Sequence, residues 1–184
     1  NPIVTASVFG SIAAQLAMPG LSNTAIALAM VGKQKGYNVK VVLPYGIAPS
    51  ISDILALYDA DITWCDALAG MKGAIDLAAK MANSSGHFHL GQFTDLANLE
   101  THYQTTGAEI DRDIASVAAF VAGIGTGGTI MGVGRRLRES HPNVRIIGVE
   151  PRMGERLQGL RSLMEGYIPP LLDLNQLLHA YDGR

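Results

Sequence analysis

With 184 residues, 48% of them hydrophobic and 16% charged, the chain can bury a core as one domain or as two small lobes, and so apolar a composition favours a sheet covered by helices on both faces. The formal net charge is only -2 and Lys and Arg form no dense cluster, which argues against nucleic acid or an anionic membrane as a partner. The one cysteine, Cys65, excludes an internal disulfide, fits a small buried side chain in a reducing compartment, and makes a cytoplasmic location the expectation.

The first half of the chain alternates helix and strand patterns. Ser22 or Asn23 can cap a helix that runs to about Lys35, and Gly36 suits the left-handed position that ends it. Ser50 with Asp53 resembles a capping box that opens a second helix. A third helix is predicted at about 71–82, and strands are predicted at 39–44, 61–65 and 87–90.

The pattern continues in the second half. Residues 98–110 read as partly helical, although Gly107 makes their course uncertain, and strands are predicted at 117–124 and 144–150. Between these strands, apolar and small residues recur at the spacing of one helix face, namely Ile130, Val133, Gly134 and Leu137. Pro169-Pro170 separates two helix-like pieces in a less regular end. Alternating strands and helices with short connections predict parallel strands joined by right-handed crossovers.

Two uncharged runs, 1–32 and 116–134, are long enough to be weighed as membrane spans. Pro19-Gly20 interrupts the first run, and glycines break the second in the manner of a strand-to-helix turn. No basic segment precedes the first run as in a signal peptide. We therefore interpret both runs as buried core and expect no membrane association.

The stretch AGIGTGGTIMGVG, residues 122–134, places a glycine-rich turn between a strand and a helix. Backbone N–H groups in such a turn can approach an anion closely, and the helix dipole favours negative charge there. A dinucleotide site is a rival interpretation, because Gly123, Gly125 and Gly128 fit GxGxxG and Glu150 closes the next strand. Too little chain follows Glu150 for the second half of that fold. A third interpretation is that the glycines only permit close packing of helix and strand.

Other polar residues give weaker signals. His87 and His89 share one strand face and could bind a metal, but no third ligand is evident, so ordinary hydrogen-bonded histidines are favoured. His102 and His141 lie among polar neighbours and are interpreted as surface or cap residues. The acidic residues Glu109, Asp111 and Asp113 are interpreted as a solvated helix face.

Four segments in order, SNTAIALAMV, HYQTTGAEI, FVAGIGTGGTIMGVGRRLRE and VRIIGVEP, resemble the cysteine synthase family of enzymes that depend on pyridoxal 5'-phosphate (PLP). The later segment EPRMGERLQGLRSLMEGYIPP resembles the O-phosphoserine-dependent cysteine synthases of actinobacteria. The resemblance implies the tryptophan synthase beta-like α/β fold, with parallel sheets in three layers. It also implies two lobes, a smaller mobile one at 22–115 and a larger one formed by 1–21 and 116–184.

The resemblance also implies roles for individual residues. The PLP phosphate is expected at Gly125, Thr126, Gly127, Gly128 and Thr129, and Asn23 is expected to bind the cofactor's ring hydroxyl. Ser22 and Thr24 lie in the same loop as Asn23 and are expected, with Gln92, to bind the amino-acid substrate. Arg161 is expected to recognise the phosphate of O-phosphoserine, a role that suits a planar charged donor.

The implied activity is β-replacement on an O-activated serine, O-phosphoserine or O-acetylserine. Its partners would be a small amino-acid substrate and a sulfur donor, either sulfide or a protein thiocarboxylate. The family resemblance also implies a homodimer.

The chain departs from the family where the cofactor-binding lysine is expected. Aligning TASVFGSIA with the family's TGSVKDRIA puts Phe9 at the lysine position, and phenylalanine cannot form an imine. The alignment also implies that a strand and much of a helix are missing before Leu21, and that the family's C-terminal region is missing. GLSNTA replaces TSGNTG, so that Ser22 and Ala25 stand where glycines are expected. An incomplete chain and an inactive relative that keeps a binding or regulatory role both remain open.

Overall fold

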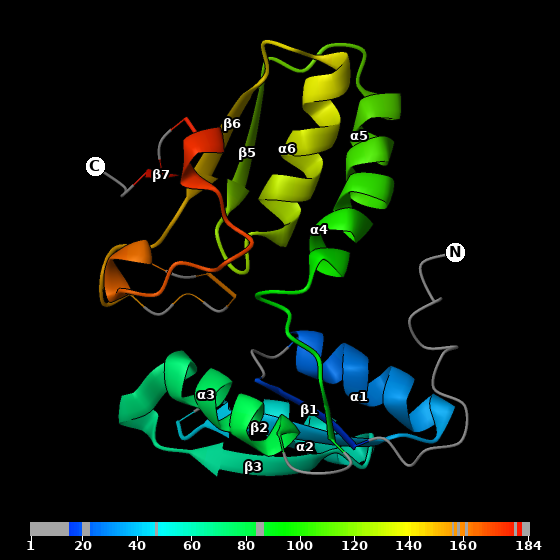
Figure 1. The fold of residues 1–184 in the computed structure, drawn as a ribbon, viewed down its shortest axis with the longest axis vertical. Helices are drawn as coiled ribbons and strands as arrows, with labels where there is room; N and C mark the ends of the chain where they lie inside the picture. Colours follow the sequence, from blue (N-terminus) through cyan, green and yellow to red (C-terminus); the bar gives the residue numbers. More distant parts are fainter. Residues whose placement is uncertain are drawn as a thin grey trace. The chain divides into compact units, whose positions relative to one another are not determined.

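The computed structural model describes residues 15–19, 23–46, 48–83, 87–155, 157, 159–160, 162–178 and 180–181 (Figure 1). The chain divides into two compact units, Asn1–Gly91 and Gln92–Arg184, which are described separately below. The lobe boundary near residue 115 that the resemblance implies stays a prediction. Ser22, Arg161 and Phe9 lie outside the described residues.

The first unit is built on a four-stranded parallel sheet in the order β3-β2-β1-β4. Its strands are β1 (Gln15–Pro19), β2 (Asn38–Pro44), β3 (Asp61–Cys65) and β4 (His87–His89). The prediction that a strand is missing before Leu21 is wrong, because β1 lies inside the sheet, where Leu16 pairs with Val39 and Phe88. Residues 15–19 follow a charge-free stretch with no turn signal before it, and this hid the strand.

Helices cover both faces of this sheet. They are α1 (Asn23–Lys35), α2 (Pro49–Leu57) and α3 (Gly70–Ala82). Side chains alternate along a strand, so Val41 of β2 packs with α1 and α2 while its neighbour Val42 packs with α3. The three-layer parallel arrangement predicted from the sequence is confirmed in this unit.

The predicted helix ends of the first unit are partly right. Gly36 follows α1 with a φ of +74°, as predicted for a left-handed end. The capping box at Ser50 and Asp53 is wrong, because α2 begins at Pro49 after Ala48, whose side chain makes no cap hydrogen bond. Proline suits the first helical position, since its φ is already helical and it lacks the N–H that would be left unpaired there.

The second unit has a three-stranded parallel sheet in the order β5-β6-β7. The strands are β5 (Ala119–Gly123), β6 (Arg145–Val149) and the two-residue β7 (Ala180–Tyr181), which the sequence analysis did not predict. The main helix is α6 (Gly128–Ser140). Short 3-10 turns at Leu163–Glu165 and Leu174–Gln176 stand on either side of Pro169-Pro170.

A second helical stretch packs along α6. It consists of α4 (Leu96–His102), a π-helical turn (Tyr103–Gly107) and α5 (Ala108–Asp113) (Figure 1). The helical stretch continues through Gly107. A Cβ at this position would stand 2.8 Å from Cβ of Arg136, so α6 packs closely against the stretch here. Contact between the two helical segments therefore requires a glycine that helix propensity alone disfavours.

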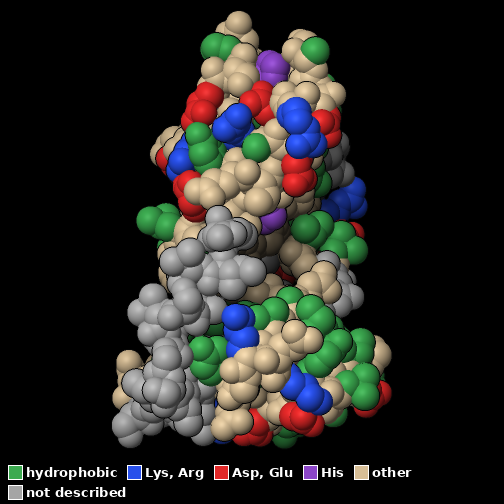
Figure 2. Space-filling view, turned by 90° about the vertical axis from the view of Figure 1, so that its right-hand side faces the viewer, with side chains coloured by type: hydrophobic (Ala, Val, Ile, Leu, Met, Phe, Trp, Pro, Cys, Tyr) green, Lys and Arg blue, Asp and Glu red, His purple; other side chains and the backbone are tan. Residues whose placement is uncertain are grey.

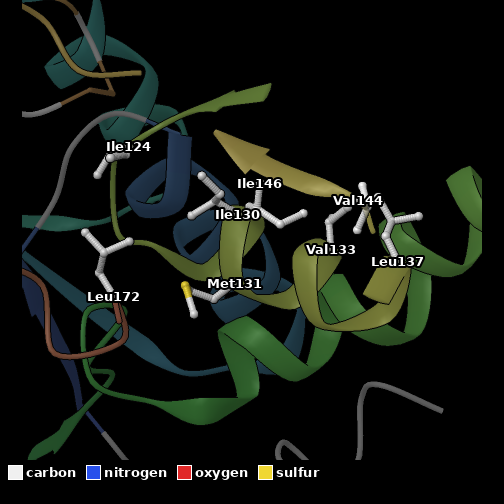
Figure 3. Packing of buried hydrophobic residues seen from close by; sticks show 8 residues of the cluster. All are labelled: Ile124, Ile130, Met131, Val133, Leu137, Val144, Ile146 and Leu172. Carbon is white, nitrogen blue, oxygen red and sulfur yellow. The ribbon is translucent and has the colours of Figure 1, made fainter. Parts of the chain in front are cut away.

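The core of the second unit lies between α6 and the sheet (Figure 3). The predicted helix face is confirmed, since Ile130, Val133 and Leu137 are at most 1% exposed. In Figure 3, Val133, Leu137 and Val144 meet at one end of α6, while Ile124, Met131 and Leu172 lie around its first turn. The start of α6, and with it the glycine-rich turn, is therefore fixed by buried packing.

The surface carries charges of both signs. On the face drawn in Figure 2, Lys and Arg side chains stand among Asp and Glu side chains on each unit. Within the described part of the chain, no helix combines the length and the apolar character needed to cross a membrane.

Candidate phosphate-binding site

The glycine-rich turn joins β5 to α6 by four residues, 124–127. Its first residue is fixed by a bond from Ile124 N to Val149 O of β6, 2.8 Å long. Its last residue, Gly127, is the N-cap of α6 with a φ of 89°, a left-handed conformation that residues with a side chain rarely adopt. The sequence thus bends the chain sharply at the point where the helix begins.

Backbone donors gather at this bend. Among the described residues, the N–H groups of Gly125, Thr126 and Gly127 have no hydrogen-bond acceptor. Gly128 N donates to Thr126 Oγ1 over 3.3 Å. Since the N-terminus of a helix also carries partial positive charge, this end of α6 offers the donors and the field that an anion needs.

Asn98 on α4 links this turn to Gln92. Its Nδ2 donates to the carbonyl oxygen of Gln92 over 2.8 Å and to Thr126 Oγ1 over 2.9 Å. Gly128 permits this arrangement, because a Cβ there would overlap the amide group of Asn98. The close-packing interpretation of the glycines therefore holds at Gly128 alongside the phosphate interpretation.

His102, one helical turn beyond Asn98, contacts Thr129 in the first turn of α6. Its Nε2 lies 3.0 Å from Thr129 Oγ1, and its Nδ1 lies 3.0 Å from Thr106 Oγ1 on the π-helical turn. Burial lowers the pKa of His102, which favours the neutral ring. His102 precedes the π-helical turn as its N-cap residue, as predicted, but its half-buried side chain makes no capping bond and instead contacts the two threonines. His141 is the C-cap of α6, as predicted.

The residues present therefore fit a single phosphate group. The donors are backbone amides and the hydroxyls of Thr126 and Thr129, and neither a basic side chain nor a metal is needed to complete the set. Tight packing keeps the turn in place, since a Cβ on Gly125 would lie 2.5 Å from the carbonyl oxygen of Gly159. Residues 125–129 are called the cradle below, and their fixed backbone can accept an anion without rearranging.

The other predicted site residues are distributed over both units. Asn23 and Thr24 form the start of α1 in the first unit, with Asn23 exposed and Thr24 half-buried. Gln92 is the first residue of the second unit and is joined to Thr126 through Asn98. The structure describes neither Ser22 nor Arg161.

Glu150, which would bind the ribose in the dinucleotide interpretation, makes a hydrogen bond within the protein instead. Its Oε2 accepts from the backbone N–H of Leu163, which ties the end of β6 to the 3-10 turn at Leu163–Glu165. This bond uses one of the acceptor positions that a ribose-binding acid would offer to its ligand. The geometry thus favours the single-phosphate interpretation of the glycine-rich turn.

The acidic residues of α5 differ from each other. Asp113 is exposed and pairs with Arg112, as predicted for a solvated face. Asp111, in contrast, has a side chain only 11% exposed, and its Oδ2 accepts from Ser140 Oγ and from Arg136 Nε, each at 3.0 Å. These hydrogen bonds, that of Ser140 first, lower the pKa of Asp111. The prediction of a solvated face is therefore wrong for Asp111, which joins α5 to α6.

No metal site accompanies the cradle among the described residues, where no three His, Cys, Asp or Glu side chains are grouped to hold an ion. His89 is half-buried, and burial lowers its pKa. Cys65 is buried as predicted, and burial raises the pKa of its thiol. All five lysines of the sequence, at positions 33, 35, 40, 72 and 80, belong to the first unit.

The parallel sheets define an α/β protein. Its glycine-rich turn, between a strand and a helix N-terminus, places it among the α/β proteins that can hold a phosphorylated ligand. Comparison with known proteins narrows this class. The chain belongs to the pyridoxal-phosphate dependent enzyme family, whose model matches residues 11–182, and PLP is the cofactor of that family. The match begins after Phe9, so it does not cover the predicted lysine position.

Curated relatives are cysteine synthases. The chain is 36% identical over 161 residues to cysteine synthase B of Pseudomonas aeruginosa, a match that covers 87% of this chain and 54% of the relative. It is 35% identical over 164 residues to a cysteine synthase of Staphylococcus aureus, covering 84% of this chain and 53% of the relative. The chain thus spans about half the length of the curated relatives that it matches.

Solved structures agree. A hydrogen sulfide-producing enzyme from Fusobacterium nucleatum matches 98% of this chain and 58% of its own, with a TM-score of 0.86 and 26% identity. O-ureido-L-serine synthase matches 95% of this chain and 58% of its own, with a TM-score of 0.84 and 28% identity. The predicted resemblance to PLP-dependent cysteine synthases and the predicted fold are confirmed, and the finer resemblance to O-phosphoserine-dependent enzymes stays a prediction.

Proposed function

We propose that the protein catalyses PLP-dependent β-replacement on an O-activated serine, O-phosphoserine or O-acetylserine, with a sulfur nucleophile. The observation that carries the proposal is the pair of bonds from Asn98, to Gln92 O at 2.8 Å and to Thr126 Oγ1 at 2.9 Å. One side chain thereby ties the residue expected to bind substrate to the turn expected to bind the cofactor phosphate. A site that aligns substrate with cofactor needs such a fixed spacing.

The residues divide the work of binding. The turn Gly125–Thr129 would hold the cofactor phosphate through its free amides, those of residues 125–127, and through the hydroxyls of Thr126 and Thr129. Asn23 would orient the ring of the cofactor. Thr24 and Gln92 would bind the substrate carboxylate, together with Ser22. When bound, PLP supplies an electron sink that stabilises negative charge at the substrate α-carbon. Relatives named cysteine synthase support sulfur as the nucleophile.

Arg161 makes O-phosphoserine the substrate that we test first. A guanidinium binds a phosphate through two parallel hydrogen bonds, whereas an acetyl ester offers it no charge. Sulfide or a protein thiocarboxylate would donate the sulfur, and a cytoplasmic homodimer would be the working form.

Phe9 favours a second candidate function, a binding or regulatory protein without catalysis. If Phe9 stands at the lysine position, the chain can hold PLP through its phosphate but cannot bind the cofactor covalently there. The cradle does not depend on that lysine, so cofactor binding and catalysis are separate questions.

Reconstitution with PLP distinguishes the two candidates. The full chain is loaded with PLP, reduced with borohydride, digested and searched for a cofactor-modified lysine by mass spectrometry. Parallel samples receive sulfide with O-phosphoserine or with O-acetylserine, and cysteine is measured. Arg161→Leu serves as the substrate variant, and Arg112→Leu, which removes an arginine from an exposed ion pair with Asp113, is its control.

A modified lysine together with cysteine formation would support the enzyme, and a loss confined to O-phosphoserine in Arg161→Leu would support the substrate assignment. PLP binding with neither modification nor cysteine would instead support the binding protein. Failure of PLP to bind at all would contradict both candidates.

A further inference from the structure

The hydrogen bonds from α4 to the cradle determine whether the hydroxyl hydrogens of Thr126 and Thr129 are free to donate to a ligand. A hydroxyl carries one hydrogen and two acceptor sites. Thr126 Oγ1 accepts from Asn98 Nδ2 at 2.9 Å and from Gly128 N at 3.3 Å. The carbonyl of Gln92 can only accept, so its 2.8 Å contact fixes the amino group of Asn98 on this side. Both acceptor sites of Thr126 Oγ1 are thus used, and its hydrogen is left to donate to a ligand.

Thr129 has no such fixed direction, because its partner is an imidazole nitrogen. In the neutral ring one nitrogen donates and the other accepts. If Nε2 of His102 carries the hydrogen, it donates to Thr129 Oγ1 and frees the hydroxyl hydrogen of Thr129. If Nδ1 carries it, Nε2 accepts that hydrogen, and Thr129 can offer an anion only its oxygen.

We propose that His102 is a positioning residue, held as the Nε2–H tautomer when the cradle is occupied, so that hydrogen bonds run in one direction from Thr106 through His102 and Thr129 to the bound phosphate. The proposal rests on the proposed function of the cradle. An anion accepts hydrogen bonds and donates none when fully ionised, so only this order leaves every member of the chain paired. Bonds aligned in one direction also strengthen one another.

The packing of α4 on α6 supports this order. A Cβ at Gly132 would stand 2.8 Å from Cβ of His102 and would also strike the backbone of α4. Glycine at 132 therefore lets His102 approach the first turn of α6 closely enough to reach Thr129. The neutral ring on which the choice of tautomer depends is favoured because burial lowers the pKa of His102.

The direct test is nitrogen-15 NMR of the full chain labelled at histidine. The spectra are recorded at neutral pH without ligand, with inorganic phosphate and with PLP. His102→Asn identifies the signals of His102. The expected result with either probe is a protonated Nε2 and an unprotonated Nδ1. An unprotonated Nε2 in the occupied state would overturn the proposal.

A double-mutant cycle tests whether His102 acts through Thr129. His102→Leu should weaken inorganic phosphate binding roughly 2- to 10-fold, as for the loss of one ordinary hydrogen bond, and should have no further effect in a Thr129→Val background. Thr105→Val is the control, since Thr105 Oγ1 donates to Thr101 O at 2.7 Å on the same helical stretch and should leave binding unchanged. Equal effects of His102→Leu in both backgrounds would contradict the proposal.

The outcomes separate the two proposals. If the wild-type chain binds neither phosphate nor PLP, the proposed function fails and this inference fails with it. If it binds them with His102 in the Nδ1–H form, the cradle stands and the inference alone is wrong. Should His102→Leu not fold, the spectra of the wild-type chain still decide.

Discussion

At the scale of single residues, Gly128 is the position where the cradle is most sensitive. Gly128→Ala places a Cβ onto the amide of Asn98, so we expect the free energy of unfolding to fall by about 1–3 kcal/mol. Binding of phosphate should weaken as well, because Asn98 loses its contact with Thr126. Gly134→Ala is a matched control on the same helix, since its Cβ would crowd Ile146 of β6, away from the cradle. Urea unfolding and phosphate titration of both variants check this, and equal binding losses would contradict it.

Asp111 should govern the acid stability of the second unit. Its pKa is lowered by the hydrogen bond from Ser140 and by Arg136, so its contribution is present above the carboxyl's ordinary pKa of 3.8 and is lost as pH falls through the lowered value. Asp111→Asn should therefore be less stable than wild type at pH 7, and the difference should shrink in acid. Asp113→Asn, at an exposed pair, should change stability less. Unfolding curves between pH 7 and pH 2 measure both, and a constant difference for Asp111→Asn would count against this role.

At the scale of elements, α6 holds the cradle in place through its buried face. Leu137→Ala removes a side chain that is 0% exposed, so we expect a loss of about 2–5 kcal/mol in the free energy of unfolding. Leu96→Ala on α4, 70% exposed, should change stability by less than about 0.5 kcal/mol. Denaturant unfolding compares the two variants. Similar values for both would mean that the face of α6 is not the core of this unit.

The same elements mark what the sequence could predict. The face of α6 was predictable because Ile130, Val133 and Leu137 recur at helical spacing, and a local pattern decides it. The continuation of the helical stretch through Gly107 was not predictable, because the close packing that requires glycine there involves Arg136, 29 positions away. Asn98 and His102 were missed as site residues for a similar reason. Their spacing of one helical turn from each other was visible, but only tertiary packing sets them against Thr126 and Thr129.

At the scale of the whole molecule, two histidines in different units should make stability depend on pH. Burial lowers the pKa of His89 in the first unit and of His102 in the second. The unfolded chain then binds protons first as pH falls below about 6.5, so each unit loses stability until pH passes below the folded pKa. Calorimetry between pH 8 and pH 5 with His89→Gln and His102→Gln checks this, and a flat profile for wild type would refute it.

Family membership and parallel topology followed from the sequence because segments in a fixed order carry more information than any one motif. The turn itself fits GxGxxG, and the bond from Leu163 N to Glu150, together with the family match, favours a single phosphate over a dinucleotide. Strand β1 and the two-residue β7 escaped prediction because their pairing, and no local pattern, makes them strands. The proposed phosphate donors nevertheless lie wholly within the second unit, so their function can be tested without knowing the rest of the site.

The most direct test follows the backbone amides of Gly125, Thr126, Gly127, Gly128 and Thr129 by proton–nitrogen NMR while the full chain is titrated with PLP, inorganic phosphate or pyridoxal, which lacks the phosphate. Binding of an anion at these N–H groups predicts large saturable shifts of these amides with PLP and with phosphate, and little change with pyridoxal. Equal responses to pyridoxal and PLP, or PLP shifts confined to other residues, would contradict the claim that this turn binds the cofactor phosphate.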